Sequence, residues 1–310
     1  MERVIRIGTR ESQLAVWQAT LVQDLLKENG YAAELVYIKS EGDIDLVTPL
    51  YEMGVQGVFT RSLDLALLND RIDIAVHSMK DVPTQLPKGI IQSAVLKRAS
   101  YKDILVVNGE LSVVSSESLT SNNSPLTIGT SSIRRKAQWL HRYPNHIIEN
   151  LRGNVNTRLR KVAESNWHGA IFAAAGLERI HLRPENSIDL DWMLPAPSQG
   201  AIMVVSRERD AFSFDACQHF NDINTALCTK IERDFLRVLL GGCSTPISAL
   251  AEVKYNAIHF RCNVVAIDGS AKAEIEQTIT FEEAENGGAL AANSLLEQGG
   301  QVIIDAIQKL

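Results

Sequence analysis

Apolar and polar positions in the first half of the chain alternate between strand-like and helix-like patterns. Residues 4–8 form a short β-rich run, and from residue 12 apolar side chains recur every three or four positions until Gly30 ends the pattern. This spacing predicts an amphipathic helix with a glycine stop. A second strand is predicted at 35–38, and a helix and a strand follow within 63–76. Such alternation is typical of βαβ units that build a largely parallel sheet.

The second half of the chain repeats this alternation and then changes character. Residues 104–107 and 126–129 are predicted to be strands of a second α/β region, with a polar stretch between them. The run at 201–206 resembles a strand that can return to the first sheet. From residue 224 onward, a helix to residue 240, three β-like runs and a final helical region predict a small α+β domain.

The pattern divides the chain into three predicted domains, and a length of 310 residues agrees with two or three domains at roughly 150 residues each. The first α/β domain is discontinuous and takes residues 1–98 and 199–219. The second α/β domain is rich in arginine and spans 102–194, and the C-terminal domain spans 224–310. A loop at 41–57 is longer than ordinary connections, which indicates a mobile or functional segment.

The composition is that of an ordinary globular protein. Hydrophobic residues make up 45% and charged residues 22% of the chain, which argues against disorder, collagen-like repeats and disulfide scaffolds. No apolar run reaches the roughly 18 residues of a membrane span, and the N-terminus is charged, so we expect a cytoplasmic protein without a membrane partner. The four cysteines form no C-x-x-C pair, and no metal-spaced cluster or phosphate-binding glycine loop occurs, so no metal is expected.

Positive charge is concentrated in one segment of an otherwise acidic chain. The formal net charge is -6, yet residues 129–183 hold ten Lys or Arg against three Glu, and the rest of the chain holds 21 basic and 34 acidic residues. Eight of the ten are arginines, whose planar guanidinium groups suit carboxylates and phosphates. The segment has little aromatic interleaving for base stacking, and the acidic remainder repels a long polyanion. A small polycarboxylate or phosphate is therefore favoured over nucleic acid.

Cations stand where a helix is predicted to begin, although that end of a helix carries partial positive charge. Residues 130–132 are candidate N-caps, and Arg134, Arg135 and Lys136 follow in the first turn. A bound anion is the simplest relief for this arrangement. Solvated surface arginines are the alternative interpretation.

The same arrangement occurs at two more predicted helix starts. Arg10 precedes Ser12 at the first helix, and Arg152 and Arg158 flank Asn154 at a later one. This recurrence favours anion binding for the group of arginines as a whole.

Residues 77–83 directly follow a predicted strand, and ligands in open α/β sheets bind beyond the carboxyl ends of the strands. An aspartate with the ordinary pKa of about 3.9 is ionised at neutral pH. Asp81 can therefore stabilise a cationic intermediate or accept a proton. The alternative is a turn aspartate that caps a helix or pairs with Lys80. His77 is more typical of a hydrogen-bonded structural group.

A glycine pair precedes one of the four cysteines. The glycines at 241–242 allow a close backbone approach and present the thiol of Cys243. A deprotonated, exposed thiol is a strong nucleophile and can carry a covalent adduct, whereas a buried and inert cysteine beside a glycine cap is the alternative. Cys217, Cys228 and Cys262 lack such a setting and are interpreted as packing residues.

Six motifs follow one another along the chain in an order that covers almost its whole length. They are the segments 9–12, 77–83, 129–135, 151–154, 196–201 and 241–243. Taken together they resemble the porphobilinogen deaminase family, and the seven-residue motif HSMKDVP at 77–83 is particularly specific.

This resemblance implies two α/β domains like those of periplasmic binding proteins and a smaller C-terminal α+β domain. It implies a transferase of tetrapyrrole (heme) biosynthesis, which joins four porphobilinogen molecules head to tail with loss of ammonia and then releases hydroxymethylbilane by hydrolysis. The implied cofactor is dipyrromethane, attached by a thioether to Cys243. The expected partner is a small-molecule substrate rather than a nucleic acid or a membrane, and the expected state is a monomer.

The resemblance also implies roles for individual residues. Asp81 matches the catalytic aspartate, which stabilises positively charged pyrroles and handles protons. The implied cofactor-binding residues are Cys243 (covalent), Lys80, Ser132, Arg134 and Arg135. The implied substrate-binding residues are Arg10, Ser12, Arg152, Arg158 and Arg179.

Three positions depart from the family pattern. Glu52 and Gln56 stand where family members often have lysines, so two expected cationic contacts are missing from that loop. Ser248 replaces a frequent glycine after the cysteine loop. A non-catalytic clamp that binds small anions is the alternative function for the same two α/β domains.

Overall fold

The computed structural model describes residues 3–39, 60–108, 125–239 and 245–309. These residues form two compact units, each of which is contributed by separate stretches of the chain. The described part of the first unit consists of residues 3–39, 60–99 and 200–227. The described part of the second unit consists of residues 100–108, 125–199, 228–239 and 245–309.

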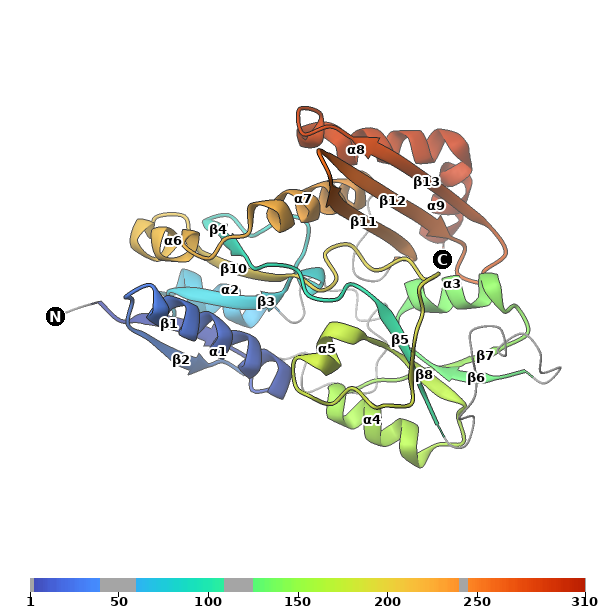
Figure 1. Cartoon of the computed structure of the whole chain (residues 1–310), viewed down its shortest axis with the longest axis horizontal. Helices are drawn as coiled ribbons and strands as arrows, with labels where there is room; N and C mark the ends of the chain where they lie inside the picture. Colours follow the sequence, from blue (N-terminus) through green and yellow to red (C-terminus); the bar gives the residue numbers. More distant parts are fainter. Residues whose placement is uncertain (1–2, 40–59, 109–124, 240–244, 310) are drawn as a thin grey trace. The chain divides into compact units, whose positions relative to one another are not determined.

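The first unit is built on a five-stranded sheet in the order β2-β1-β3-β10-β4 (Figure 1). Strand β1 pairs in parallel with β2 and β3, whereas β10 runs antiparallel to both β3 and β4. The predicted return of the strand near residue 201 to the first sheet is therefore confirmed. The strands are β1 (Ile5–Thr9), β2 (Ala33–Tyr37), β3 (Ile74–Ser78), β4 (Ile90–Val95) and β10 (Ile202–Arg207).

Helices cover both faces of this sheet. Helices α1 (Gln13–Glu28) and α6 (Ala211–Gln218) pack with one set of apolar strand residues, and α2 (Arg61–Leu68) packs with the other set. Successive residues of a strand point to opposite faces, which is why each strand supplies both cores. Helix α1 begins at the predicted place, and Ser12 caps it, because its side chain accepts a hydrogen bond from the backbone N–H of Ala15.

The second unit contains another five-stranded sheet, in the order β7-β6-β8-β5-β9 (Figure 1). Strand β6 lies parallel to both β7 and β8, and β5 runs antiparallel to β8 and β9. Parallel neighbours end at the same edge of a sheet, so the turns after β6, β7 and β8 share one edge. The strands are β5 (Asp103–Val107), β6 (Thr127–Gly129), β7 (Ile147–Glu149), β8 (Gly169–Ala173) and β9 (Ser187–Asp189).

Helices also cover both faces of the second sheet. Helix α3 (Ile133–Arg142) buries Trp139 against one face, and α4 (Val155–Glu164) and α5 (Ala174–Glu178) pack on the other. Ser132, one of the three candidate N-caps, caps α3, and Asn154 caps α4 at the predicted helix start. The α/β character predicted for both regions is therefore confirmed, with antiparallel strands added to each parallel core.

The second unit also holds a three-stranded antiparallel sheet in the order β11-β12-β13. Helices α7 and α8 pack closely against each other beside this sheet. Gly288 of α8 allows this contact, since a Cβ there would lie only 2.2 Å from the backbone oxygen of Ile231 in α7. The predicted helix, three strands and final helical region are confirmed. Their bounds are α7 (Ile223–Val238), β11 (Ile247–Lys254), β12 (Ala257–Val265), β13 (Lys272–Ile279), α8 (Ala284–Leu295), η4 (Leu296–Gly300) and α9 (Gln301–Gln308).

The predicted division into three domains stays a prediction. The three sheets correspond to the three predicted regions, but the second and third sheets belong to one compact unit. Among the described residues, Cys217, Cys228 and Cys262 are buried and form no disulfide, which confirms their interpretation as packing residues. Burial raises the pKa of the Cys217 and Cys262 thiols to about 12.

Candidate active site

Asp81 lies directly beyond the carboxyl end of β3. It is the last residue of a short 3₁₀ turn, η2 (Met79–Asp81), and its side chain is half-buried. Met79 and Val82 on either side of it are buried in the core, and the backbone N–H of Met79 donates to the oxygen of Ala201 at 3.0 Å. Within the described chain, no hydrogen bond or ion pair engages the Asp81 carboxylate. The turn therefore holds an acceptor at the sheet edge where ligands bind in α/β folds.

The residues that precede Asp81 are tied to helix α1. The side-chain amide of Gln18, which is buried, donates to the Ser78 hydroxyl at 2.9 Å. His77 is buried one residue earlier, and burial together with the nearby positive charge of Arg10 lowers its pKa to about 4. A group with that pKa is neutral at neutral pH. The geometry thus favours a structural His77, as the sequence predicts.

Arg10 and Ser12 stand at the start of α1, where the loop after β1 enters the helix. Both side chains are half-buried. The Ser12 hydroxyl oxygen accepts the backbone N–H of Ala15 at 3.4 Å, which leaves its own proton for another acceptor. Lys80 is also half-buried, beside Asp81 in the 3₁₀ turn. The first unit thus places Arg10, Ser12, Lys80 and Asp81 in the turns that follow its two adjacent parallel strands.

In the second unit, Arg134 and Arg135 are buried in the first turn of α3, with side chains only 5% and 7% exposed. Both guanidinium groups bind the carboxylate of Asp103, at the start of β5. Arg134 Nη2 lies 2.6 Å from one carboxylate oxygen, and Arg135 Nη2 lies 2.8 Å from the other. We name Asp103, Arg134 and Arg135 the Asp103 cluster.

The structure differs from the simplest expectation at this helix start. The sequence predicts that a bound external anion balances the charge of these arginines. In the structure the carboxylate of Asp103, from the same chain, balances part of that charge. Two cations share this one carboxylate, so the cluster keeps an excess positive charge. Burial lowers the pKa of Arg134, and the Asp103 charge opposes that shift. Within the described residues, the Nε of Arg134 is buried without a hydrogen-bond acceptor.

The helix start at α4 adds two more arginines at the same sheet edge. Arg152 is buried in the turn after β7, and Arg158 donates from Nε to the backbone oxygen of Gly153 at 2.7 Å. The Ser131 hydroxyl donates to the backbone oxygen of Leu151 and joins this turn to the one that precedes α3. The local structure thus brings together two of the predicted anion-binding segments.

Arg179 follows β8, the third parallel strand, at the C-terminal end of α5. Burial lowers its pKa to about 10, and the neighbouring Glu178 carboxylate opposes the shift. Arg179 remains cationic at neutral pH. The predicted arginines of the second unit therefore lie in the segments that follow three adjacent parallel strands, either in the connecting turn or in the next helix. This arrangement is suited to the several carboxylates of one small ligand.

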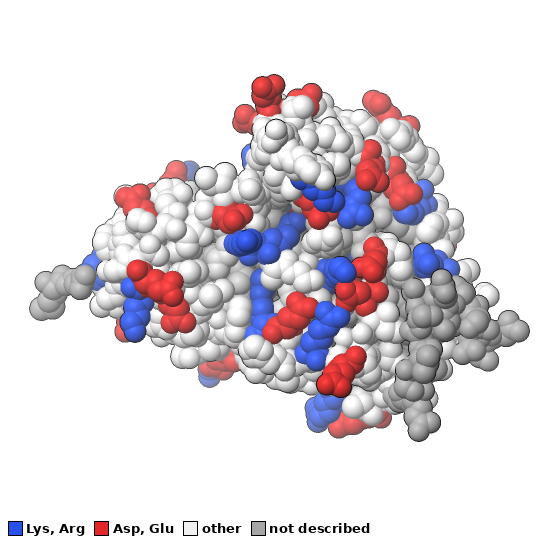
Figure 2. All heavy atoms as spheres, viewed as in Figure 1, with Lys and Arg blue, Asp and Glu red and all other residues white. Residues whose placement is uncertain are grey.

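Arg183, at the end of the 129–183 segment, and Lys102, outside it, have acidic neighbours instead. Basic and acidic side chains lie next to one another in places on the face drawn in Figure 2. Arg183 pairs with Glu178 at 2.7 Å and with Asp189 at 2.5 Å, and Lys102 pairs with Asp189 at 2.8 Å. Local ion pairs thus neutralise part of the excess positive charge of residues 129–183.

Some predicted residues lie outside the described part of the chain. These are Cys243, Glu52 and Gln56, together with the whole loop at 41–57. Among the residues that the structure does describe, no group of three or more His, Cys, Asp or Glu could hold a metal ion. Within the same ranges, no helix is both long and apolar enough to cross a membrane.

Sequence reasoning missed Asp103. It also missed the hydrogen bond that Gln199, a residue of the 196–201 motif, makes with Asp103. The Gln199 side-chain amide donates to the Asp103 carboxylate at 2.9 Å and to the backbone oxygen of Tyr101 at 2.7 Å. The sequence signal for Asp103 was an aspartate directly before a run of four apolar residues, which predicts a buried strand. The structure shows that every residue of this strand, DILVV, is buried. A buried carboxylate requires a cationic or hydrogen-bonding partner, and the arginine-rich segment was the obvious source.

Two family models match the chain. The model described as "Porphobilinogen deaminase, dipyromethane cofactor binding domain" matches residues 5–214. The model described as "Porphobilinogen deaminase, C-terminal domain" matches residues 226–297. The first range includes Asp81 and all the arginines of the predicted site.

Two individual porphobilinogen deaminases give the same result. The chain is 37% identical to a porphobilinogen deaminase of Chlorobium phaeobacteroides, over 100% of this chain and 99% of that protein. It is 39% identical to the porphobilinogen deaminase of Syntrophotalea carbinolica, over 98% and 96% of the two chains. Among solved structures, the ligand-binding component of an ABC-type import system from Staphylococcus aureus is similar with a TM-score of 0.41, at 17% identity over 76% of this chain and 74% of that one.

The family models and the relatives cover both units and agree with the six motifs of the sequence. The relatives are matched over nearly their entire length. The chain therefore belongs to the porphobilinogen deaminase family.

Proposed function

We propose that this chain is a hydroxymethylbilane synthase, which condenses four porphobilinogen molecules and releases hydroxymethylbilane. In each condensation the aminomethyl C–N bond of one porphobilinogen breaks, ammonia leaves, and a C–C bond forms to a free pyrrole carbon, which loses its proton. The observation that carries the proposal is the position of the half-buried Asp81 carboxylate beyond β3, in a chain that matches the family over its whole length. That full-length match favours the enzyme over a non-catalytic anion clamp.

Asp81 is proposed as the catalytic residue. Loss of ammonia leaves a positively charged pyrrole, and a fixed carboxylate stabilises such a charge without reorganising during the reaction. The same carboxylate can accept the proton released when the new C–C bond forms. The rigid turn between the buried Met79 and Val82 holds the carboxylate in place for both tasks.

The cationic side chains, together with two serine hydroxyls, are proposed to bind acetate and propionate groups. Lys80, Ser132, Arg134 and Arg135 would hold the cofactor, and Arg10, Ser12, Arg152, Arg158 and Arg179 would hold the substrate. The excess charge of the Asp103 cluster and the buried Nε of Arg134 fit a polycarboxylate ligand. The dipyrromethane group, when attached to Cys243, supplies the free pyrrole position at which the chain grows.

The remaining expectations are also proposals. We propose that the protein acts in the cytoplasm as a monomer, on a small-molecule substrate and without nucleic acid or membrane partners. The described cysteines are buried and form no disulfide, which supports a reducing compartment.

Asp81→Asn tests the catalytic assignment. Asparagine keeps the size of the side chain and removes its charge, so turnover of porphobilinogen should fall about 100-fold or more, while the unfolding midpoint stays near that of the wild type. The control is Asp305→Asn, an exposed change on α9 that should leave turnover unchanged. Near-normal activity of Asp81→Asn would contradict the role.

Intact-protein mass spectrometry completes this experiment. The wild type and Asp81→Asn should both exceed the mass of the polypeptide by one dipyrromethane unit, and Cys243→Ala should not. A wild-type protein that carries no added mass and shows no turnover after supply of porphobilinogen would favour the anion clamp.

A further inference from the structure

A serine of the C-terminal sheet is hydrogen-bonded to the helix that carries the buried arginines. Ser248, in β11, is completely buried, and its hydroxyl oxygen accepts the side-chain amide of Gln138 at 2.9 Å. Gln138 lies in α3 and is only 6% exposed. A glycine or an alanine at position 248 has no side-chain oxygen and cannot make this contact.

The side-chain amide of Gln138 makes three hydrogen bonds, one to Ser248 and two to the backbone of Leu194. Its Oε1 accepts the backbone N–H of Leu194 at 2.9 Å, and its Nε2 donates to the backbone oxygen of Leu194 at 2.9 Å as well as to Ser248. An amide that makes all three bonds has a single orientation. Loss of the Ser248 oxygen leaves one buried N–H without its acceptor and loosens that orientation.

The backbone oxygen of Leu194 connects Gln138 to Arg134. Arg134 Nη1 donates to this oxygen at 2.6 Å, and residues 134 and 138 lie on the same face of α3 because they are four positions apart. Arg134 in turn binds Asp103. A continuous buried network thus runs from Ser248 through Gln138 and Leu194 to the Asp103 cluster.

The segment 194–199 is held to β11 at two further points. The backbone N–H of Ala249 donates to the oxygen of Pro195 at 3.2 Å. The buried carboxylate of Glu232 accepts the N–H of Ser198 at 2.6 Å and the N–H of Ala251 at 2.7 Å. These hydrogen bonds hold β11 and residues 194–199 together independently of Ser248. Loss of the Ser248 hydroxyl should therefore affect the Gln138 contact and not the position of β11.

The far end of α3 is fixed by the same sheet. The turn between β12 and β13 places the oxygen of Gly269 2.8 Å from the His141 ring nitrogen Nδ1. Gly269 has a φ of +78°, and a Cβ there would lie 2.4 Å from the backbone nitrogen of His141. The C-terminal sheet therefore contacts both the middle and the end of α3.

We propose that Ser248 is a positioning residue, which acts through Gln138 to fix Arg134 relative to β11 and thereby tunes carboxylate binding. This inference rests on the proposed function, in which Arg134 holds an acetate or propionate group. Strand β11 begins four residues after Cys243 in the sequence, so the same contact joins the segment that follows the cofactor cysteine to the arginine helix.

Ser248→Ala tests this inference. Arg134 would hold an acetate or propionate group of the cofactor, to which the incoming porphobilinogen couples, so a less firmly held cofactor should weaken binding of the substrate beside it. The KM for porphobilinogen should rise about three- to tenfold, which is the net worth of one hydrogen bond, while kcat changes less than twofold. The amide of Leu194 should exchange its hydrogen about tenfold faster, because its acceptor Gln138 is no longer held. Gln138→Leu should act in the same direction, and the double variant should show a KM close to that of the stronger single variant.

Ser93→Ala is the matched control. Ser93 is another completely buried strand serine, whose hydroxyl donates to Ser206 at 2.7 Å in the first unit. It should lower stability about as much as Ser248→Ala and leave both KM and the Leu194 exchange rate unchanged. If Ser248→Ala also lowers only stability, Ser248 is merely structural and the inference is wrong.

The two proposals fail in distinguishable ways. Absence of turnover in the wild type would reject the proposed function, yet hydrogen exchange at Leu194 still reports whether Ser248 and Gln138 act together. If Leu194 exchange is the same in Ser248→Ala and in the wild type, the coupling is absent whatever the enzyme does.

Discussion

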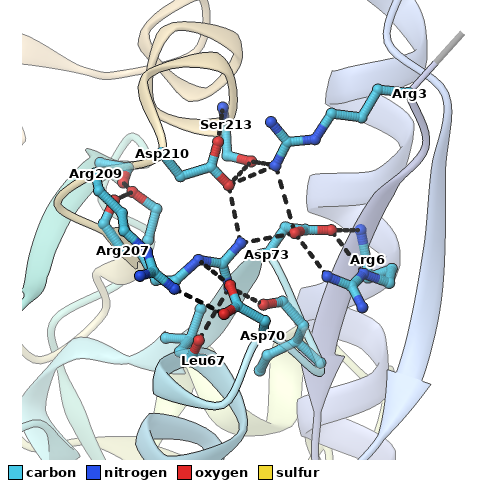
Figure 3. Close-up of polar contacts among 12 residues, drawn as sticks. Arg3, Arg6, Leu67, Asp70, Asp73, Arg207, Arg209, Asp210 and Ser213 are labelled. Atoms are coloured by element: carbon cyan, nitrogen blue, oxygen red, sulfur yellow. Dashed lines mark hydrogen bonds and ion pairs between the residues drawn. The ribbon is translucent and has the colours of Figure 1, made fainter.

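Two arginine–aspartate clusters in this molecule have different charge balances. The first, which we name the Asp73 cluster, consists of Arg3, Arg6, Arg207, Asp70, Asp73 and Asp210 in the first unit (Figure 3). Its three arginines face three carboxylates, and the exposed Arg209 also pairs with Asp70 at the rim. The Asp103 cluster of the second unit has two cations for one carboxylate.

The two clusters also lie at opposite ends of their strands. In the Asp73 cluster, Asp73 directly precedes β3 and accepts the backbone N–H of Arg6 in β1, so the cluster lies at the amino ends of the parallel strands. Arg134 and Arg135 follow the carboxyl end of β6. Ligands bind at carboxyl ends, whereas the opposite edge only has to be stable. The comparison teaches that the cluster at the amino ends matters for stability, whereas the Asp103 cluster, in which two buried guanidinium groups share one carboxylate, has the excess charge that the proposed ligand binding requires.

Asp103→Asn should give the largest effect on stability. It leaves two buried guanidinium groups without their carboxylate, and breaking a buried ion pair in this way typically costs about 3–5 kcal/mol. Urea unfolding of the variant and the wild type measures the difference. A loss below about 1 kcal/mol would mean that the arginines escape to solvent, and the contrast between the two clusters would then disappear.

Asp73→Asn should cost less at neutral pH, about 1.5–3 kcal/mol, the range for hydrogen bonds to a charged group. Burial alone would raise the pKa of Asp73, but hydrogen bonds from Arg6 and Arg207 outweigh it and hold that pKa well below its ordinary value. A lowered pKa in the folded state stabilises the fold above the unfolded pKa of about 3.9, and this contribution is lost as the pH falls toward the folded pKa.

The pH dependence sharpens this prediction. The gap in unfolding free energy between the wild type and Asp73→Asn should be full near neutral pH and should shrink below about pH 4. Because the cluster is far from the ligand edge of the sheet, KM for porphobilinogen should not change. An equally large gap in acid and at neutral pH would contradict the assigned cause.

Arg209→Ala should have the smallest effect. Arg209 pairs with Asp70 at 2.7 Å on the rim of the Asp73 cluster, with side chains 71% and 57% exposed. Exposed ion pairs contribute about 0–1 kcal/mol and weaken in salt. Unfolding at low and high salt should show a small difference that vanishes at high salt. A larger, salt-independent loss would place Arg209 among the buried members of the cluster.

Local patterns in the sequence predicted most of the elements. Helix starts were predicted at Ser12, at residues 130–132 and at Asn154, and Ser12, Ser132 and Asn154 each accept a capping backbone hydrogen bond there. The motif at 77–83 located Asp81 at the end of a strand, because the strand-to-turn transition depends only on neighbouring residues. The same reasoning placed arginines at helix starts.

Contacts between distant residues were beyond such reasoning. Asp103 and Arg134 are 31 positions apart, and Gln138 and Ser248 are 110 positions apart. Nothing in the local spacing links them, since their proximity depends on the order of strands in a sheet and on how a second sheet packs against α3. The external anion expected at α3 was replaced in part by Asp103 for this reason.

The sequence by itself determined the type of most elements, the helix starts near residues 12, 132 and 154, and the family to which the chain belongs. Periodicity and capping are short-range properties, and the family motifs are short continuous segments. Only the tertiary structure decided which charges are buried together and which serine holds the arginine helix. Pairing of buried charges and hydrogen-bonding groups is a long-range property, because it depends on where the folded chain excludes water.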